Sequence, residues 1–301
     1  MARARSAVGL ALCLAVWALP TASVAGRSAD ALIREARAAL AGRDPRLARS
    51  LMEEAAATGD AEALNNLATF AEMGVGAAPD SALALRLIEQ AAERGSVAAK
   101  LNLGLRLTSS EREADQRRAV ELLIDVHNDP PDPAVSEKTR AIAAGGLGVA
   151  FLLGRGAAQD VLRGVEYLEE ADAHGDADER TLFLLGRAYQ RGWDVRQPEP
   201  QRALGYFQRA ADMGHAQSAW QIGMAHLRGA GVPASDALAY DWFVRAGEGG
   251  DPRGDVSAAV LLSQGRGTVE DDREARRLYT RAAESGNAHA LRGLGEMLLR
   301  G

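Results

Sequence analysis

Ala91-Ala92-Glu93-Arg94-Gly95 is the stretch that decides the fold, because its A-A-x-x-G pattern returns along the chain. The other full copies are Ala55-Ala56-Ala57-Thr58-Gly59, Ala210-Ala211-Asp212-Met213-Gly214 and Ala282-Ala283-Glu284-Ser285-Gly286. Looser copies end at Gly175 and Gly250. Successive glycines lie 36, 80, 39, 36 and 36 residues apart, so the step of 80 contains one degenerate copy. A recurring period of this length is typical of a repeat protein.

A second landmark, an apolar residue followed by a small one, marks every unit. Its copies are Leu67-Ala68, Leu103-Gly104, Leu147-Gly148, Leu185-Gly186, Ile222-Gly223, Ala258-Ala259 and Leu294-Gly295. Six residues after the small residue comes a glycine, except in one unit, where Ser110 takes its place. Each unit therefore reads as a first helix, a glycine-containing turn and a second helix.

The apolar spacing between the landmarks is that of an α-helix. Residues 84, 87, 88, 91 and 92 form one stripe, with the larger Leu87 and Ile88 in the middle. The same slots recur at 203–211 and 275–283. The glycine after each stripe supplies a left-handed C-cap. The candidate N-caps of the second helices are Asp44, Asp80, Asp160, Asp236 and Asp272.

Neither helix of a unit can bury its stripe alone, so the units must stack. The sequence predicts an all-α fold, a right-handed α/α solenoid of about seven helix-turn-helix repeats, with first helices on the concave side. Aromatic residues make up only 5% of the chain and 32 residues are glycine, which argues against an all-β fold. The predicted domains are a short unit over 26–60 and the main solenoid over 61–301.

The first 25 residues have the pattern of a secretory signal peptide, and the alternative is an N-terminal anchor that is not cleaved. Arg3 and Arg5 precede an apolar run from Ala7 to Leu19, and Ser23-Val24-Ala25 offers a cleavage site. The single cysteine, Cys13, lies inside that run, so no disulfide is expected after cleavage. We expect a periplasmic or secreted bacterial protein with no membrane span after the signal is removed.

Two segments depart from the repeat. Asp129-Pro130-Pro131-Asp132-Pro133 replaces the glycine that should end the third unit, which predicts a kink at 128–138. The fifth unit has a longer turn that contains Trp193, a candidate contact point. His127, just before the prolines, either caps carbonyl groups at the helix end or has a pH-sensitive or ligand role. Gly145, Gly146 and Gly148 indicate close helix packing or, alternatively, a hinge.

No pattern in the sequence indicates catalysis. The five histidines show no metal-ligand spacing, and there is neither a G-x-S-x-G nucleophile motif nor a phosphate-binding loop. Triplets such as Gly154-Arg155-Gly156 recur at the same point of the units and are read as turns. The formal net charge of -6 argues against a nucleic-acid partner. We therefore predict no catalytic residues, no metal site and no cofactor.

The combined pattern, A-x-x-x-L-G-x-x-Y-x-x-G-x-G-V followed by a capped helix and A-A-x-x-G, resembles the Sel1-like repeat. Tyr189-Gln190-Arg191-Gly192, Gly229-Ala230-Gly231-Val232 and Ala239-Tyr240-Asp241-Trp242-Phe243 carry the likeness. It covers residues 61–301, whereas residues 30–60 look more like a compact tetratricopeptide unit. The resemblance implies a protein-interaction scaffold whose partners differ between members.

The candidate partner-binding residues follow from that resemblance. Asn66 and Asn102 lie 36 residues apart, and Gln221 has the equivalent place in a later unit. In related tetratricopeptide grooves an asparagine at this point of the first helix can hold an extended peptide. The alternative is that these amides bond within the solenoid. Phe183 and Trp220 lie one position earlier, where an aromatic side chain either anchors a partner or packs in the core.

The sequence therefore favours an exported, non-catalytic adaptor that binds a protein or peptide on its concave face. The expected setting is bacterial cell-envelope assembly, surface-polymer export or host contact. The alternative is an enzyme-like role in cell-wall or β-lactam chemistry, which has been proposed for cysteine-rich exported members of the family. This chain lacks their cysteines and has no Ser-x-x-Lys motif.

Overall fold

The structure, a computed structural model, describes residues 27–128, 136–175, 177–192 and 197–300. Within these segments the chain forms fifteen α-helices and no strand, which confirms the predicted all-α fold. The signal-peptide segment 1–25, Trp193 and the proline-rich part of the predicted kink lie outside the described residues.

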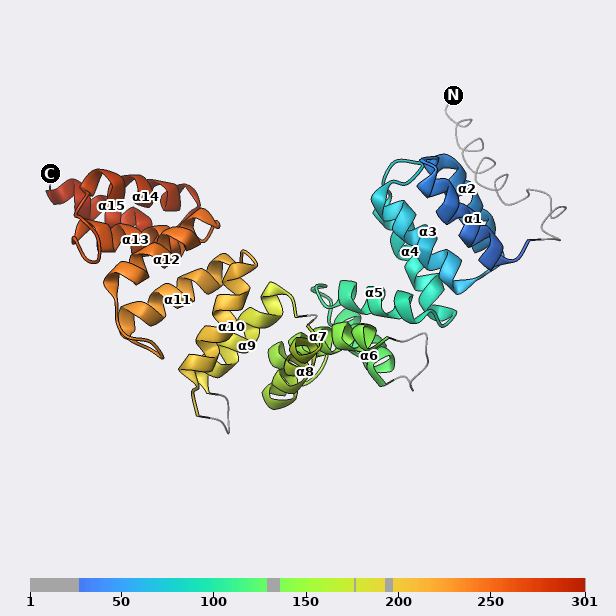
Figure 1. Ribbon diagram of the computed structural model, residues 1–301, viewed down its shortest axis with the longest axis horizontal. Coiled ribbons are helices and arrows are strands. Elements are labelled where there is room, and N and C mark those ends of the chain that lie inside the picture. Colours follow the sequence, from blue (N-terminus) through green and yellow to red (C-terminus); the bar gives the residue numbers. More distant parts are fainter. Residues whose placement is uncertain (1–26, 129–135, 176, 193–196, 301) are drawn as a thin grey trace, which may run out of the picture. The chain divides into compact units, whose positions relative to one another are not determined.

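The helices follow one another with short connections (Figure 1). Their bounds are α1 (Ala29–Ala41), α2 (Pro45–Ala57), α3 (Ala61–Met73), α4 (Ser81–Glu93), α5 (Val97–Leu107), α6 (Glu113–Asn128), α7 (Glu137–Leu153), α8 (Val161–Ala173), α9 (Glu179–Arg191), α10 (Pro200–Asp212), α11 (Ala216–Arg228), α12 (Asp236–Glu248), α13 (Pro252–Ser263), α14 (Asp272–Glu284) and α15 (Ala288–Arg300).

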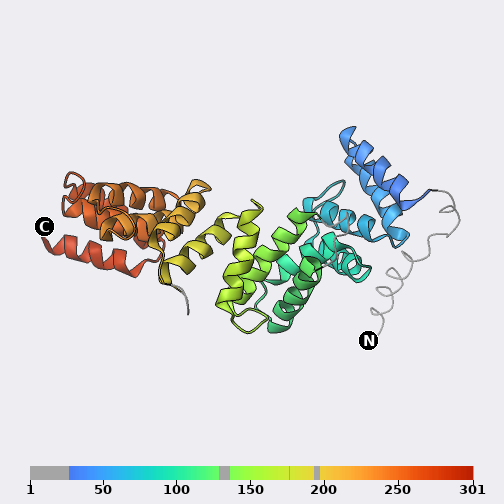
Figure 2. The same cartoon turned by 60° about the horizontal axis from the view of Figure 1, so that its bottom comes forward.

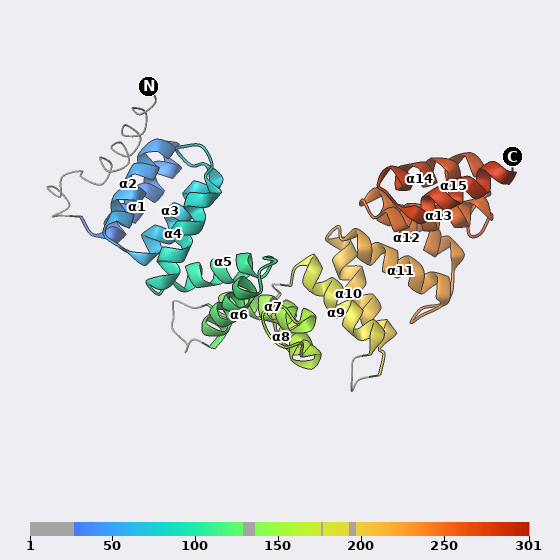
Figure 3. The same ribbon diagram turned by 180° about the vertical axis from the view of Figure 1, so that it is seen from behind.

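The chain divides into two compact units, and the boundary lies within α5, between Lys100 and Leu101. In the first unit α1 to α4 pack in chain order, and in the second α6 to α15 do the same (Figure 2). First helices of neighbouring repeats also contact each other: α7 contacts α9, and α13 contacts α15. Figure 3 shows α13 and α15 from behind. Each unit is thus a stack of helical hairpins, as a solenoid requires.

In α7, α9 and α11 the glycine of the second landmark leaves room for a large side chain of the following helix. A Cβ atom added to Gly223 of α11 would lie 2.5 Å from the ring of Phe243 in α12. Gly186 of α9 meets the ring of Phe207 at 2.6 Å, and Gly148 of α7 meets Leu168 at 2.6 Å. For Gly148 this confirms the predicted close helix packing, and Gly186 and Gly223 have the same role.

The predicted apolar stripes are the buried faces of the second helices. The five stripe residues of α4 and the five of α10 are all buried. In α14 four of the five are buried and Ala283 is half-buried. Leucine, tyrosine and phenylalanine in the middle of each stripe supply most of the apolar area that these helices remove from water.

Most of the predicted caps are in place. Asp44, Asp80 and Asp160 cap α2, α4 and α8. The predictions of Asp236 and Asp272 were each wrong by one residue, because Ser235 caps α12 and Asp271 caps α14. Each observed cap accepts a hydrogen bond from the backbone N–H three residues later, which leaves the predicted aspartate in the first turn.

The second glycine of each G-x-G turn presses against the preceding repeat. A Cβ atom on Gly156 would lie 2.1 Å from the carbonyl oxygen of Gln116, in the first turn of α6. Gly76, Gly231 and Gly267 are placed in the same way against residues 45, 200 and 236, where α2, α10 and α12 begin. All four have positive φ angles, between 72° and 79°. Through these glycines the turn of each hairpin packs directly on the backbone of the preceding hairpin.

His127 and the clustered glycines of α7 have packing roles. The Nε2 atom of His127 lies 2.9 Å from a carboxylate oxygen of Glu170 in α8, so the ring joins two second helices. Within the described residues the ring bonds only to side chains, those of Asn128 and Glu170, so no capping of a backbone carbonyl group is seen there. A Cβ atom on Gly146 would lie 2.8 Å from Leu123, and Gly148 leaves room for Leu168. Close packing therefore explains these two glycines.

Candidate functional site

The candidate site is the surface formed by the first helices α9, α11 and α13 of three consecutive repeats. We call it the α9–α13 face and define it by Phe183, Arg187, Trp220, Gln221 and Arg253. All three helices lie in the second unit. Side chains connect each helix to the next, so the face is one continuous surface.

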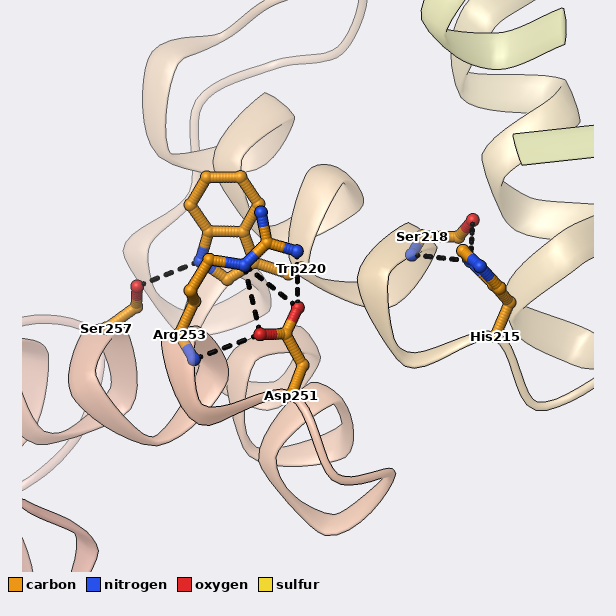
Figure 4. A network of polar contacts seen from close by, with 6 residues as sticks. All are labelled: His215, Ser218, Trp220, Asp251, Arg253 and Ser257. Atoms are coloured by element: carbon orange, nitrogen blue, oxygen red, sulfur yellow. Dashed lines mark hydrogen bonds and ion pairs between the residues drawn. The ribbon is translucent and has the colours of Figure 1, made fainter. Parts of the chain in front are cut away.

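Trp220 joins α11 to α13. Its Nε1–H donates a hydrogen bond to Ser257 Oγ at 3.1 Å, and the Arg253 guanidinium carbon lies 4.4 Å from the centre of the indole (Figure 4). The half-buried ring packs against the buried cluster around α9 and α10 and also against the one around α13 and α14. Trp220 therefore has a structural role in addition to the cation–π contact that it offers at the surface.

Asp251 holds Arg253 in place over the indole. Its carboxylate is only 7% exposed and caps α13 by accepting the backbone N–H of Arg253 at 3.0 Å. The Nε and Nη2 groups of the same arginine donate to both carboxylate oxygens, at 3.0 and 2.7 Å (Figure 4). Such a two-point ion pair fixes the direction of the guanidinium plane.

Phe183 connects α9 to the start of α11. Its ring centre lies 5.9 Å from that of Phe207 and 4.6 Å from that of His215. The Arg187 guanidinium carbon, one turn further along α9, is 5.7 Å from the same ring. Phe183 is therefore partly a core residue and partly a support for a charged side chain.

His215 is the N-cap of α11, a place usually taken by a small polar residue. Its Nδ1 atom accepts the backbone N–H of Ser218 at 3.2 Å and lies 2.9 Å from the Ser218 hydroxyl (Figure 4). An acceptor nitrogen carries no proton, so this contact requires the neutral ring. Burial lowers the pKa of His215, while Glu179, Asp251 and Asp178 act in the opposite direction.

We expect the protein to lose stability as the pH falls from 7 to 5, partly through His215. Its pKa in the folded state lies below the ordinary value of 6.5, so the unfolded chain binds the proton more readily. The contribution is complete above pH 6.5 and declines as the pH falls toward the folded-state pKa. His215→Asn keeps a capping oxygen without titrating. Urea unfolding at several pH values should give a flatter profile for this variant, and an unchanged profile would contradict the assignment.

Two hollows adjoin the face. One, of 340 Å³, lies beside His215 and is lined by Glu179, Met213, Gln217 and Asp251. The other, of 380 Å³, lies between α5, α7 and α9, where Gly145 and Gly146 leave room beside Thr108, Arg180 and Thr181. Both are open to solvent.

Phe183, Trp220 and Gln221 lie on neighbouring first helices of the second unit, whereas the two asparagines belong to different units. Asn66 belongs to the first unit and Asn102 to the second. The amide nitrogen of Asn66 is buried and has no hydrogen-bond partner within the described residues, while Asn102 is exposed. Trp193 lies outside those residues. Gln221 is 9% exposed and accepts a hydrogen bond from Gln190 at 3.2 Å, so its amide is used within the solenoid.

Sequence reasoning missed Arg187, His215 and Arg253. The signals were present but weak: Arg187 follows Phe183 by four residues, and Arg253 follows an Asp-Pro pair that starts a helix. Among all described residues, the site included, no group of three His, Cys, Asp or Glu side chains is placed to bind a metal ion. No helix of those segments combines the length and the apolar character needed to cross a membrane.

Comparison with known families gives six matches to the Sel1 repeat. They cover residues 39–60, 61–96, 141–176, 180–215, 216–251 and 257–287. The first match includes part of the segment that was expected to resemble a tetratricopeptide unit. Residues 97–140 are not matched, and they contain the degenerate repeat of α5 and α6.

Two solved structures are similar over most of the chain. One is c5321, a protective antigen present in uropathogenic Escherichia coli strains and displaying an SLR fold, with 26% identity and a TM-score of 0.69. The match covers 84% of this chain but only 52% of that protein. The other is a Sel1 repeat protein from Oxalobacter formigenes, with 23% identity, a TM-score of 0.66 and coverage of 89% and 76%. No curated protein matches the chain.

Proposed function

Because this chain belongs to the Sel1 repeat family, whose solenoids are typically protein-interaction scaffolds, we propose that it is an exported adaptor that binds a protein partner on the α9–α13 face. The partner would belong to a bacterial cell-envelope process, such as envelope assembly, surface-polymer export or host contact. Binding, rather than catalysis, is the activity that the site supports.

The observation that carries this proposal is the pairing of aromatic and arginine side chains on consecutive first helices. Phe183 lies under Arg187 on α9, and Trp220 of α11 lies under Arg253 of α13. Aromatic residues and arginine are the side chains that contribute most to binding energy at protein interfaces. Their rings are already fixed by the core, so little side-chain entropy is lost when a partner binds.

Export is supported by the sequence of residues 1–25, with its arginines, its short apolar run and its small residues before the cleavage point. The mature chain would contain no cysteine, so its fold would not depend on the redox state of its compartment. Stability would come from helix packing alone.

A site-specific photo-crosslinker tests the proposal without disturbing the core. We expect a photoreactive residue at exposed Gln217, beside the hollow at His215, to capture an envelope protein in living bacteria. The same residue at exposed Arg276 on α14, a second helix, is the matched control and should capture far less. Mass spectrometry of the purified chain should show that residues 1–25 are absent. Equal capture from both positions, or an uncleaved cytoplasmic chain, would contradict the proposal.

A further inference from the structure

Arg187 is a half-buried cation that has no ion-pair partner among the residues that the structure describes. Other arginines of the second unit have a carboxylate partner: Arg209 forms an ion pair with Asp172, and Arg281 forms one with Asp255. Within the described residues no ion pair joins Arg187 to a carboxylate, and its guanidinium carbon lies 5.7 Å from the centre of the Phe183 ring. A charged group that is partly removed from water normally has a partner of opposite charge.

Positive charge is concentrated around it. Arg191 lies one turn further along α9, and Arg253 approaches from α13. Burial, followed by the charges of Arg191 and Arg253, lowers the pKa of Arg187. Asp251 neutralises part of the charge of Arg253 but none of that of Arg187. The free protein therefore holds these cations together against their mutual repulsion, which is a common property of binding sites.

The surroundings of Arg187 suit an extended peptide. Phe183 and Trp220 provide apolar ring surface next to the two guanidinium groups that they support. Arg253 has its Nε and Nη2 groups engaged by Asp251, whereas all five N–H groups of Arg187 are free to donate within the described part of the chain. A guanidinium group binds a carboxylate through two parallel hydrogen bonds. Neighbouring side chains of an extended peptide alternate in direction and could meet cation and ring in turn.

We propose that Arg187, with Arg253 and Trp220, binds the carboxylates of an acidic, extended segment of the partner protein, in which Asp or Glu residues alternate with apolar ones. The inference rests on the proposed function and specifies the chemistry of its partner. Charge complementarity selects this occupant: the cluster attracts anions, and the overall charge of -6 disfavours a nucleic acid. The carboxylates of the partner would supply the counter-charge that the described residues do not.

Fluorescence anisotropy with labelled decapeptides and the purified mature chain tests the inference. One peptide alternates Asp with Leu and Phe, the second replaces each Asp by Asn, and the third replaces each Asp by Lys. We expect the Asp peptide to bind at least about tenfold more tightly than the Asn peptide, and the difference to shrink as salt is added. The Lys peptide should bind most weakly. Equal binding of the Asp and Asn peptides would overturn the inference.

Arg187→Gln should abolish most of the preference for the Asp peptide, while Arg276→Gln, which removes the same charge from α14, should preserve it. The melting temperature gives a second readout. Arg187→Gln should leave it unchanged or raise it, because the substitution relieves repulsion from Arg191 and Arg253. A lowered melting temperature would assign Arg187 a structural role, and the same loss of binding in both variants would show a non-specific effect of net charge; either result would overturn the inference. If either result were found and the photo-crosslinker at Gln217 still captured a partner, the adaptor function would stand. Only the proposal that the partner binds through an acidic segment would be rejected.

Discussion

Gly267→Ala is expected to destabilise the protein by about 3 kcal/mol or more. Gly267 has φ +72°, and a Cβ atom there would lie 2.2 Å from the carbonyl carbon of Asp236. The left-handed conformation costs an L-residue about 1–2 kcal/mol, and forcing atoms into a packed contact costs about 1–3 kcal/mol more. The obstructing atoms belong to the backbone of α12, so no side chain can rotate away.

Gly286→Ala separates the cost of the left-handed conformation from the cost of the packed contact. Gly286 has φ +79°, close to that of Gly267, but nothing lies within 4 Å of an added Cβ atom. It should therefore lose only the conformational term, about 1–2 kcal/mol. Urea unfolding followed by far-UV circular dichroism measures both variants. Equal losses would show that the contact between the turn and α12 contributes nothing.

The second large effect is expected from Arg281→Ala. Arg281 of α14 donates through Nε to Asp255 Oδ2 of α13 at 2.7 Å, and a second bond joins Nη2 to Oδ1. Asp255 is 3% exposed, and its carboxylate fits against α12 only because residue 247 is a glycine. Removing the arginine leaves a buried charge without a counter-ion, which should destabilise the protein by about 3 kcal/mol or more.

Asp255→Ala removes the same ion pair from the other side and should cost less, about 1–2 kcal/mol. The Arg281 side chain is 38% exposed, so it can turn into water, and Glu248 is close enough to offset part of its charge. Thermal unfolding of the two single variants compares them directly. A larger loss for Asp255→Ala than for Arg281→Ala would mean that packing around the carboxylate matters more than its charge.

The helical stripes were predictable because they depend on spacing alone. Leu87 and Ile88, like Tyr206 and Phe207, occupy slots that repeat with the helical period, and burial follows from that period. The cap positions at α12 and α14 were less predictable. Ser235 and Asp236 are both good capping residues, as are Asp271 and Asp272, so local preference does not choose between them.

The site was predictable only where it belongs to the repeat. Phe183, Trp220 and Gln221 were found because they stand at fixed distances from the second landmark. Arg187 was missed because arginines are frequent in this chain and the sequence does not distinguish this one from the others. What distinguishes it is the absence of an ion-pair partner on α11 and α13, which only the fold shows. For Gln221 the sequence left two roles open, and its bond to Gln190 favours the internal one.

The G-x-G turns have a consequence for how the chain is made. Gly76, Gly156, Gly231 and Gly267 each rest on a helix that comes earlier in the sequence. The surface that completes a new turn has therefore already been synthesised when that turn appears. Each repeat can dock as soon as it emerges, so little apolar surface stays exposed during growth of the chain. The contact that each of these turns makes therefore needs no residue that comes later in the sequence.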